Sequence, residues 1–181
     1  MTAGAALSST RSTTDERVDR TLGRLLDDLT TVLLQLSSDV YVTKPLPHVS
    51  GSIGEHVRHI LDHVAAFATA RPHGTFSYDH RERGTSVERD LGAALRTIVR
   101  LKSMLGTITD DDLSTPVTVA SILGRGEPSS HARSTLRREL AFVVSHTIHH
   151  QALIAVLLAM VGVDSPDAFG LAPPTPRFAQ S

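Results

Sequence analysis

The apolar residues of this chain recur three and four positions apart in four long stretches, which is the spacing of one face of a helix. The pattern predicts helices at about residues 14–39, 52–70, 85–107 and 134–162, and the last of them is the most apolar. No stretch between them has a convincing strand pattern, and the sequence has no internal repeat. Four long helices predict an all-α fold, namely an up-and-down four-helix bundle with a long loop before the last helix.

Small and polar residues divide the chain around these helices. We expect a disordered N-terminal tail at 1–13, the bundle at 14–163 and a Pro-rich C-terminal tail at 164–181. The long loop covers about 108–132, and within it Val117 to Val119 can form a short extended piece. In an up-and-down bundle this loop lies at the opposite end from the loop at 71–85.

Side chains that cap helices mark two of the predicted starts. Ser50 or Ser52 can cap the second helix, and Thr85 with Glu88 three residues later resembles a capping box for the third. A capping side chain accepts hydrogen bonds from the first free N–H groups of a helix, so these residues predict where each helix begins.

Composition narrows the classes of function. The 181 residues include 18 Lys and Arg against 19 Asp and Glu, so no basic surface for nucleic acid is expected. Because the chain has no cysteine, a metal site must use histidine and carboxylate ligands. The N-terminus lacks the apolar core of a secretory signal, and the longest apolar run, 152–163, is too short to span a membrane. We therefore expect a cytoplasmic protein with no membrane partner.

The last helix carries three histidines in the stretch SHTIHHQALI. His146 and His150 lie one turn apart, roughly 40° from each other around the helix, so both rings can reach one point. Leu153 and Leu157 share their stripe, which predicts that the pair faces the core. His149 is also one turn from His146 but is directed away from that stripe, so the pair His146/His149 ranks second.

Two other residues of this helix bear on a metal site. Thr147 follows His146 where a zinc protease has its glutamate, which disfavours metalloprotease chemistry. Glu139 lies on the same stripe two turns earlier, where its carboxylate can orient a ligand or act near the metal. The alternative is that these histidines are hydrogen-bonded core residues without a metal.

A metal site needs at least one more ligand, and the second predicted helix can supply it. His56, His59 and His63 are spaced there at one-turn intervals, so helical geometry does not choose between them. The apolar side of the helix is centred nearer His56 and His63, which favours those two mildly as inward-facing residues.

The stretch SIGEHVRHI and the stretch SHTIHHQALI together resemble the histidine motifs of the DinB/YfiT-like superfamily of metal-binding four-helix bundles. The resemblance covers about residues 14–162 and includes the order of the elements, with one ligand on the second helix and a His-x3-His pair on the last. It implies that His59, His146 and His150 are the metal ligands. After the pair the superfamily usually has Arg-Gly-Gln, where this chain has Gln-Ala-Leu.

The resemblance also implies a chemistry. The superfamily includes thiol-dependent transferases and isomerases that use low-molecular-weight bacterial thiols, and domains that contribute three histidines to the non-haem iron of sulfoxide synthases. Zinc, nickel and iron are associated with such sites. The expected cofactor is therefore a divalent metal ion, Zn, Ni or Fe, with a low-molecular-weight thiol as co-substrate.

Several polar residues are candidates for chemistry and for substrate binding. The candidates for proton transfer or ligand orientation are His63, Glu139 and Tyr78. The polar loop after the second helix can bind the carboxylate or phosphate of a substrate through Arg81 and Arg83, and Asp79 is a further candidate for substrate binding. The alternative for this loop is a solvated segment with local salt bridges.

These observations lead to three classes of function. The first is a metal-dependent enzyme acting on a small molecule, with thiol transfer ahead of hydrolysis, and with iron-dependent oxygen chemistry third because Asp62 or Glu139 can complete a two-His-one-carboxylate site. The second is a non-catalytic metal-binding or stress-response protein. The third is a purely structural bundle. Pairing into a homodimer through helix faces is compatible with each class.

Overall fold

The computed structural model of the protein describes residues 15–45, 51–70, 72–79 and 84–172. The predicted N-terminal tail lies outside the described residues, as does the end of the predicted C-terminal tail. Within the described residues the chain forms seven helices and three strands: α1 (Asp15–Leu33), α2 (Ser38–Val42), α3 (Ile53–Ala68), β1 (Thr75–Ser77), α4 (Ser86–Arg89), α5 (Leu91–Leu105), α6 (Asp110–Leu113), β2 (Pro116–Ser121), β3 (Ser130–Thr135) and α7 (Leu136–Met160).

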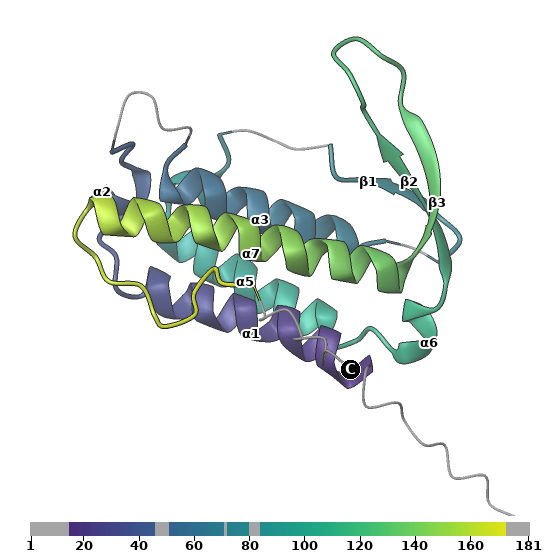
Figure 1. Ribbon diagram of the computed structural model, residues 1–181, viewed down its shortest axis with the longest axis horizontal. Coiled ribbons are helices and arrows are strands. Elements are labelled where there is room, and N and C mark those ends of the chain that lie inside the picture. Colours follow the sequence, from purple (N-terminus) through teal and green to yellow (C-terminus); the bar gives the residue numbers. More distant parts are fainter. Residues whose placement is uncertain (1–14, 46–50, 71, 80–83, 173–181) are drawn as a thin grey trace, which may run out of the picture.

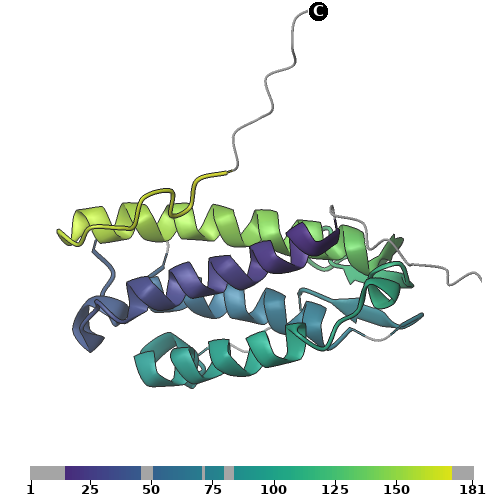
Figure 2. The same cartoon turned by 90° about the horizontal axis from the view of Figure 1, so that it is seen from below.

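Four long helices, α1, α3, α5 and α7, lie side by side and form the body of the molecule (Figures 1 and 2). Both α5 and α7 pack on α1 and α3, so α5 and α7 occupy opposite corners of the bundle. The apolar stripes predicted from the sequence are buried between the helices, and removing this surface from water is the main term that favours the fold. The buried residues include Leu22, Leu26, Leu29, Val57, Ile60, Val64, Ala94, Ile98, Leu101, Leu140, Val143, Ile154 and Leu157.

The helices do not follow the predicted up-and-down order. The short helix α2, which follows α1, packs on both α3 and α4, and α4 leads into α5. The end of α1 and the starts of α3 and α5 therefore lie at the same end of the bundle, and α3 and α5 run parallel (Figure 1). The connection between α3 and α5 crosses the length of the bundle. Its length allows either a local loop or a crossover, since extended chain covers about 3.3 Å per residue.

A small sheet at the other end corrects the prediction of an all-α fold. Its order is β1-β2-β3, with β1 parallel to β2 and β2 antiparallel to β3. The extended piece predicted at Val117 to Val119 is part of β2, and both valines are buried. Because β1 pairs with β2, the connections that follow α3 and α5 lie at the same end of the bundle, not at opposite ends as predicted (Figure 1).

Two of the predicted helices are interrupted. The first ends at Leu33 and resumes as α2, where the Ser37 side chain accepts a hydrogen bond from the Val40 N–H. The third is divided at Asp90, which caps α5 by accepting from the Gly92 N–H. A polar side chain that binds a backbone N–H beyond itself competes with a continuous helix, which explains both breaks.

One predicted cap is confirmed and another is wrong. Ser52 and Glu55 form a reciprocal capping box at the start of α3. Thr85 makes no capping hydrogen bond at the start of α4. Glu88, its predicted partner, instead accepts from the Gly84 N–H and pairs with Arg58 of α3. Tertiary pairing therefore replaces the local cap.

The segment after α7 turns back along that helix (Figure 2). Phe169 is buried in the core, and Gly170 has a positive φ of 72°. A Cβ at Gly170 would lie 2.4 Å from the backbone nitrogen of Ala152, so only glycine permits this approach. The described part of the segment after α7 therefore packs on the bundle.

The helix α7 is long and apolar enough, by length and composition alone, to cross a membrane. It is longer than the apolar run recognised in the sequence. In the structure it packs on α1 and α3 and contributes Leu140, Val143 and Ile154 to the core. Core helices of soluble proteins pass the same test, so one such helix is weak evidence for a membrane span.

Candidate metal centre

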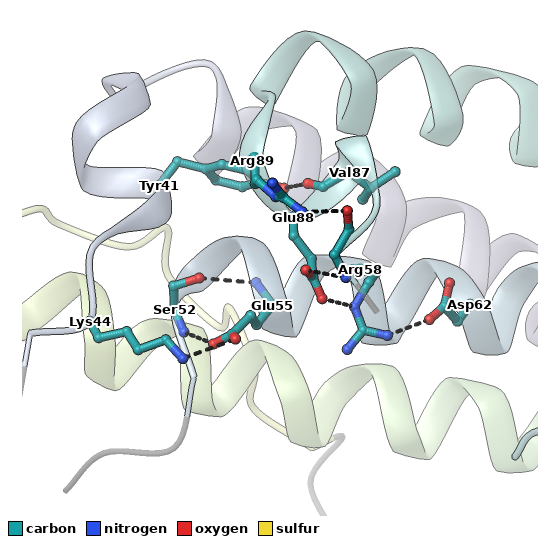
Figure 3. A network of polar contacts seen from close by, with 10 residues as sticks. Tyr41, Lys44, Ser52, Glu55, Arg58, Asp62, Val87, Glu88 and Arg89 are labelled. Atoms are coloured by element: carbon teal, nitrogen blue, oxygen red, sulfur yellow. Dashed lines mark hydrogen bonds and ion pairs between the residues drawn. The ribbon is translucent and has the colours of Figure 1, made fainter. Parts of the chain in front are cut away.

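Tight contacts hold the start of α3 against α2 and α4 (Figure 3). The buried Tyr41 hydroxyl of α2 donates to the backbone carbonyl of Val87 in α4, 2.6 Å away. Burial raises the pKa of Tyr41, with smaller contributions from nearby carboxylates. Gly54 of α3 lies so close to α4 that a Cβ there would be 2.2 Å from the carbonyl oxygen of Glu88. These contacts join α2, the start of α3 and α4 into one packed unit, which we call the clamp.

An ion-pair network fixes the rotation of α3 within the clamp. Arg58 Nε lies 2.5 Å from Glu88 Oε1, and Arg58 NH1 lies 2.8 Å from Asp62 Oδ2, one turn later on α3 (Figure 3). The Arg58 side chain is only 11% exposed. Because Arg58 and Asp62 share one side of α3, His56 and His63 fall on the opposite side, toward α7.

Three histidines from α3 and α7 converge between the two helices. His59, His146 and His150 each offer a ring nitrogen, and these nitrogens all lie within 4.8 Å of one another. Nε2 of His146 and Nε2 of His59 are 3.0 Å apart. Zinc–nitrogen bonds are about 2.0–2.1 Å long, so one ion can bind two nitrogens at this separation. The three histidines predicted as ligands are therefore brought together and can hold a metal ion.

Two more histidines of α3 surround this triad. Nδ1 of His56 lies 3.0 Å from Nδ1 of His150, and Nδ1 of His63 lies 2.9 Å from the backbone oxygen of His59. Metal-bound histidines generally use their second ring nitrogen in a hydrogen bond that fixes the orientation of the ring. If the Nδ1–H of His150 donates to His56, Nε2 of His150 carries the lone pair that a metal needs.

The surroundings of His150 suit a neutral ligand. Burial, together with the neighbouring histidines His146 and His56, lowers the pKa of His150 to about 3. The ring is therefore uncharged near neutral pH. Neutral imidazole is the form that binds divalent metals, so the donor set fits zinc, nickel or iron.

The pair His146/His150 on α7 lies in the cluster, as predicted, but Leu153 on the same stripe is less buried than predicted. His149 is exposed, so the second-ranked pair His146/His149 does not form the cluster. Leu157 is buried at 2% exposure, as its stripe predicts, but Leu153 is 36% exposed. The inward stripe is thus narrower than the sequence pattern indicates.

A buried carboxylate lies near the cluster at the start of α7. Glu139 is 1% exposed and accepts hydrogen bonds from Ser134 at 2.5 Å, from Arg138 at 2.8 Å and from the Tyr78 hydroxyl at 3.1 Å. Burial raises the pKa of Tyr78, and the adjacent Glu139 charge raises it further. The hydroxyl therefore remains protonated and donates to Glu139.

His63 connects this pair to the three converging histidines. Its ring stacks on Tyr78 with the centroids 5.1 Å apart and on His146 with the centroids 3.9 Å apart. The three residues predicted for proton transfer, His63, Glu139 and Tyr78, therefore form a connected group beside the three histidines.

Of the three residues predicted to bind substrate, the structure describes only Asp79. Arg81 and Arg83 lie outside the described residues, so their role stays a prediction. Asp79 accepts a hydrogen bond from the Ile122 N–H at 2.7 Å. This carboxylate therefore fastens the end of β2 to the segment after β1.

The residue that follows the ligand pair has a structural partner. Gln151 is fully buried, and its Nε2 donates to the backbone oxygen of Leu25 in α1 at 2.7 Å. This bond joins the part of α7 that carries His150 to α1. Gln151 thus supports the helix that presents the ligands.

Sequence reasoning missed three partners of the predicted residues. His56 was recognised as inward-facing but not as a partner of His150, which requires knowing how α3 and α7 are paired. Ser134 and Arg138 were not singled out. Their proximity to Glu139 in the sequence is a weak signal, because the carboxylate had no known direction.

Comparisons with known proteins agree with this geometry. Residues 6–154 match the family model described as the DinB superfamily, a range that includes both histidine motifs. The chain is also 30% identical over 100 residues to FK506-binding protein 5 of Rhizopus delemar. That region is 55% of this chain and 26% of the relative, so the chain spans about a quarter of the relative's length.

Proposed function

Since the chain belongs to the DinB superfamily, we propose that it binds a divalent metal ion through His59, His146 and His150 and acts on a small molecule. The observation that carries the proposal is the convergence of these nitrogens within 4.8 Å from two helices far apart in the sequence. Transfer of a low-molecular-weight thiol to a small electrophile is the first candidate reaction, and hydrolysis is the second.

The chain supplies the ligands and their orientation. A bound divalent ion supplies Lewis acidity, which lowers the pKa of a water or thiol and yields a nucleophile near neutral pH. The contact between His56 and His150 supports the proposal, because it holds one ligand ring in the orientation needed. The low pKa of His150 supports it too, because no proton must be displaced at neutral pH.

Tyr78, Glu139 and His63 are the proposed catalytic group. Tyr78 holds a proton on its hydroxyl oxygen and donates it toward Glu139. Its phenol can instead donate to an oxygen or sulfur that becomes negative during the reaction, a form of stabilisation that preorganised donors provide. His63 keeps the Tyr78 ring in place by stacking.

The remaining expectations complete the proposal. Arg81 and Arg83 are proposed to contact an anionic part of the substrate, and Asp79 is proposed as a further substrate-binding residue. We propose that the partners of the protein are small molecules and not nucleic acid or membranes. We also propose that the protein is cytoplasmic and forms a homodimer.

Metal content tests the proposal directly. Protein purified without a histidine tag is expected to hold about one Zn, Ni or Fe ion per chain and to melt at a higher temperature when that metal is added. His150→Ala is expected to lose the ion and keep its far-ultraviolet circular dichroism spectrum. His149→Ala, at an exposed position, is the matched control and should retain the ion. Absence of both bound metal and metal-dependent stabilisation in the wild type would refute the proposal.

A second measurement separates the enzyme from the alternative. Consumption of 1-chloro-2,4-dinitrobenzene with a panel of low-molecular-weight thiols is expected to depend on the metal and to disappear in His150→Ala. Stoichiometric metal without turnover of thiol or ester substrates would favour a non-catalytic metal-binding or stress-response protein. The extra histidines His56 and His63 beside the triad are the observation that favours this alternative.

A further inference from the structure

A cavity of about 280 Å³ lies between the sheet and the first turns of α7. Its lining includes Ser121 of β2, Arg133 and Ser134 of β3, and Arg138 and Glu139 of α7. A second cavity of about 380 Å³ shares Arg133, Ser134 and Arg138 with the first. The two cavities are therefore neighbours, and both arginines border each of them.

Arg138 is held in place at the edge of the first cavity. Its NH1 donates to Glu139 Oε1 at 2.8 Å, and its guanidinium carbon lies 5.5 Å from the centroid of the Phe142 ring. The side chain is nevertheless 67% exposed. A guanidinium has five N–H donors, so donors remain for a ligand. An arginine that is already oriented loses little conformational freedom when a ligand binds.

The charges on the cavity lining favour one carboxylate. Arg133 and Arg138 contribute two positive charges and Glu139 contributes one negative charge, which leaves an excess of one positive charge. Glu139 already accepts hydrogen bonds from three donors, including Arg138 and Ser134. A single carboxylate balances the excess charge, whereas a phosphate dianion would reverse it.

Phe142 lies between the arginine at the edge of the cavity and the histidine cluster on α7. Phe142 contacts both the Arg138 guanidinium and the ring of His146, at 5.5 Å and 5.7 Å between centres. Arg138 and His146 are eight residues apart, which is about 12 Å along the helix axis at 1.5 Å per residue. This spacing sets the distance between an anionic group bound at Arg138 and the histidine cluster.

We propose that this cavity binds the carboxylate group of a small organic molecule. Arg138 is the principal cation, Arg133 adds a second charge, and the Ser121 hydroxyl is a nearby donor. The inference rests on the proposed function only in identifying this molecule with the substrate. The carboxylate site itself does not require the metal.

Butyrate is a suitable probe, because it carries one carboxylate and no metal-binding thiol. Its binding to the metal-loaded protein is followed by NMR, once with zinc and once with cobalt(II) as a paramagnetic reporter. Butyrate protons are expected at a distance on the order of 10–15 Å from cobalt, as the helical spacing requires. Arg138→Gln is expected to weaken butyrate binding at least tenfold while retaining the metal, and Arg133→Gln to weaken it less. Arg125→Gln, in the exposed hairpin turn away from both cavities, is the matched control and should bind as the wild type does.

The outcomes separate this site from the metal site. His150→Ala is expected to lose the metal and still bind butyrate, so failure of the proposed metal chemistry would leave the carboxylate site intact. Equal butyrate affinity in Arg138→Gln and wild type would overturn the inference, as would butyrate coordinated directly to cobalt. Tighter binding of inorganic phosphate than of butyrate would overturn the assignment to a carboxylate.

Discussion

The two tyrosines of the chain lie toward opposite ends of the bundle, and each hydroxyl donates to a buried or half-buried acceptor. Tyr41 donates to the backbone carbonyl of Val87, which does not change its protonation. Tyr78 donates to the carboxylate of Glu139 and stacks on His63 beside the metal triad. Burial raises the pKa of both hydroxyls. The same side chain therefore stabilises packing at one end, whereas at the other end it is our proposed proton donor.

The two tyrosines also differ in how tightly their surroundings are packed. The clamp around Tyr41 leaves no room for a Cβ at Gly54. Beyond Tyr78, a cavity of about 280 Å³ reaches Glu139. Because α3 runs from the clamp toward the sheet, its start is tightly packed and its other end lies at the end of the bundle that carries this cavity. The clamp end is therefore tightly packed, whereas the sheet end carries the cavity that we propose as a carboxylate site.

The largest loss of stability is expected when a side chain is added at Gly54. In Gly54→Ala the new Cβ would lie 2.2 Å from the Glu88 carbonyl oxygen and 2.9 Å from the Tyr41 ring, so α4 must move away from α3. We expect the free energy of unfolding in urea to fall by about 3 kcal/mol. The matched control is Gly23→Ala in α1, where no heavy atom lies within 4 Å of the new Cβ. The control should be neutral or slightly stabilising. Equal stability of the two variants would mean that the clamp is not tightly packed.

Gly54 also illustrates how much of the fold the sequence predicts. The helices follow from local periodicity, and Ser52 and Glu55 are recognisable as a cap because both lie within one turn. The role of Gly54 depends on Glu88, which lies more than thirty residues away along the chain. The crossover is equally non-local, because the loop between α3 and α5 has a length that suits either topology. The sheet was missed because β1 is short and β3, with the sequence SHARST, lacks an apolar pattern.

An intermediate effect, a loss of metal affinity, is expected from replacing His56, which lies between the clamp and the triad. His56→Ala removes the contact between its Nδ1 and Nδ1 of His150, so the ligand ring is no longer held in orientation. We expect zinc affinity, measured by competition with a chromogenic chelator, to fall about 10- to 100-fold. His149→Ala, at the exposed position immediately before His150, should leave affinity unchanged. A His56→Ala protein with wild-type affinity would show that His150 needs no partner.

The candidate site shows where reasoning from sequence ends. The pair His146/His150 follows from helical spacing and burial of its stripe, but the choice of His59 over His56 and His63 came from the resemblance to a family. The apolar side of the helix favoured the other two as inward-facing residues, and in the structure His63 is indeed the most buried of the three. The structure explains the difference: His59 reaches the nitrogen of His146, while His56 and His63 contact ligands from the side.

The smallest change in stability is expected from removing either tyrosine hydroxyl, and it compares the two ends most directly. Tyr41→Phe leaves the Val87 carbonyl without this donor and should cost about 1 kcal/mol of unfolding free energy. Metal-dependent turnover should be unchanged, because the clamp lies away from the reacting group.

Tyr78→Phe should cost a similar amount of stability, since Glu139 retains Ser134 and Arg138 as donors. Its turnover should nevertheless fall about tenfold or more, as expected when a proton donor is lost. Urea unfolding and steady-state kinetics of the two metal-loaded variants provide the comparison. If both variants lose stability alike and neither loses turnover, Tyr78 has the same structural role as Tyr41, and the proposed division between the two ends is wrong.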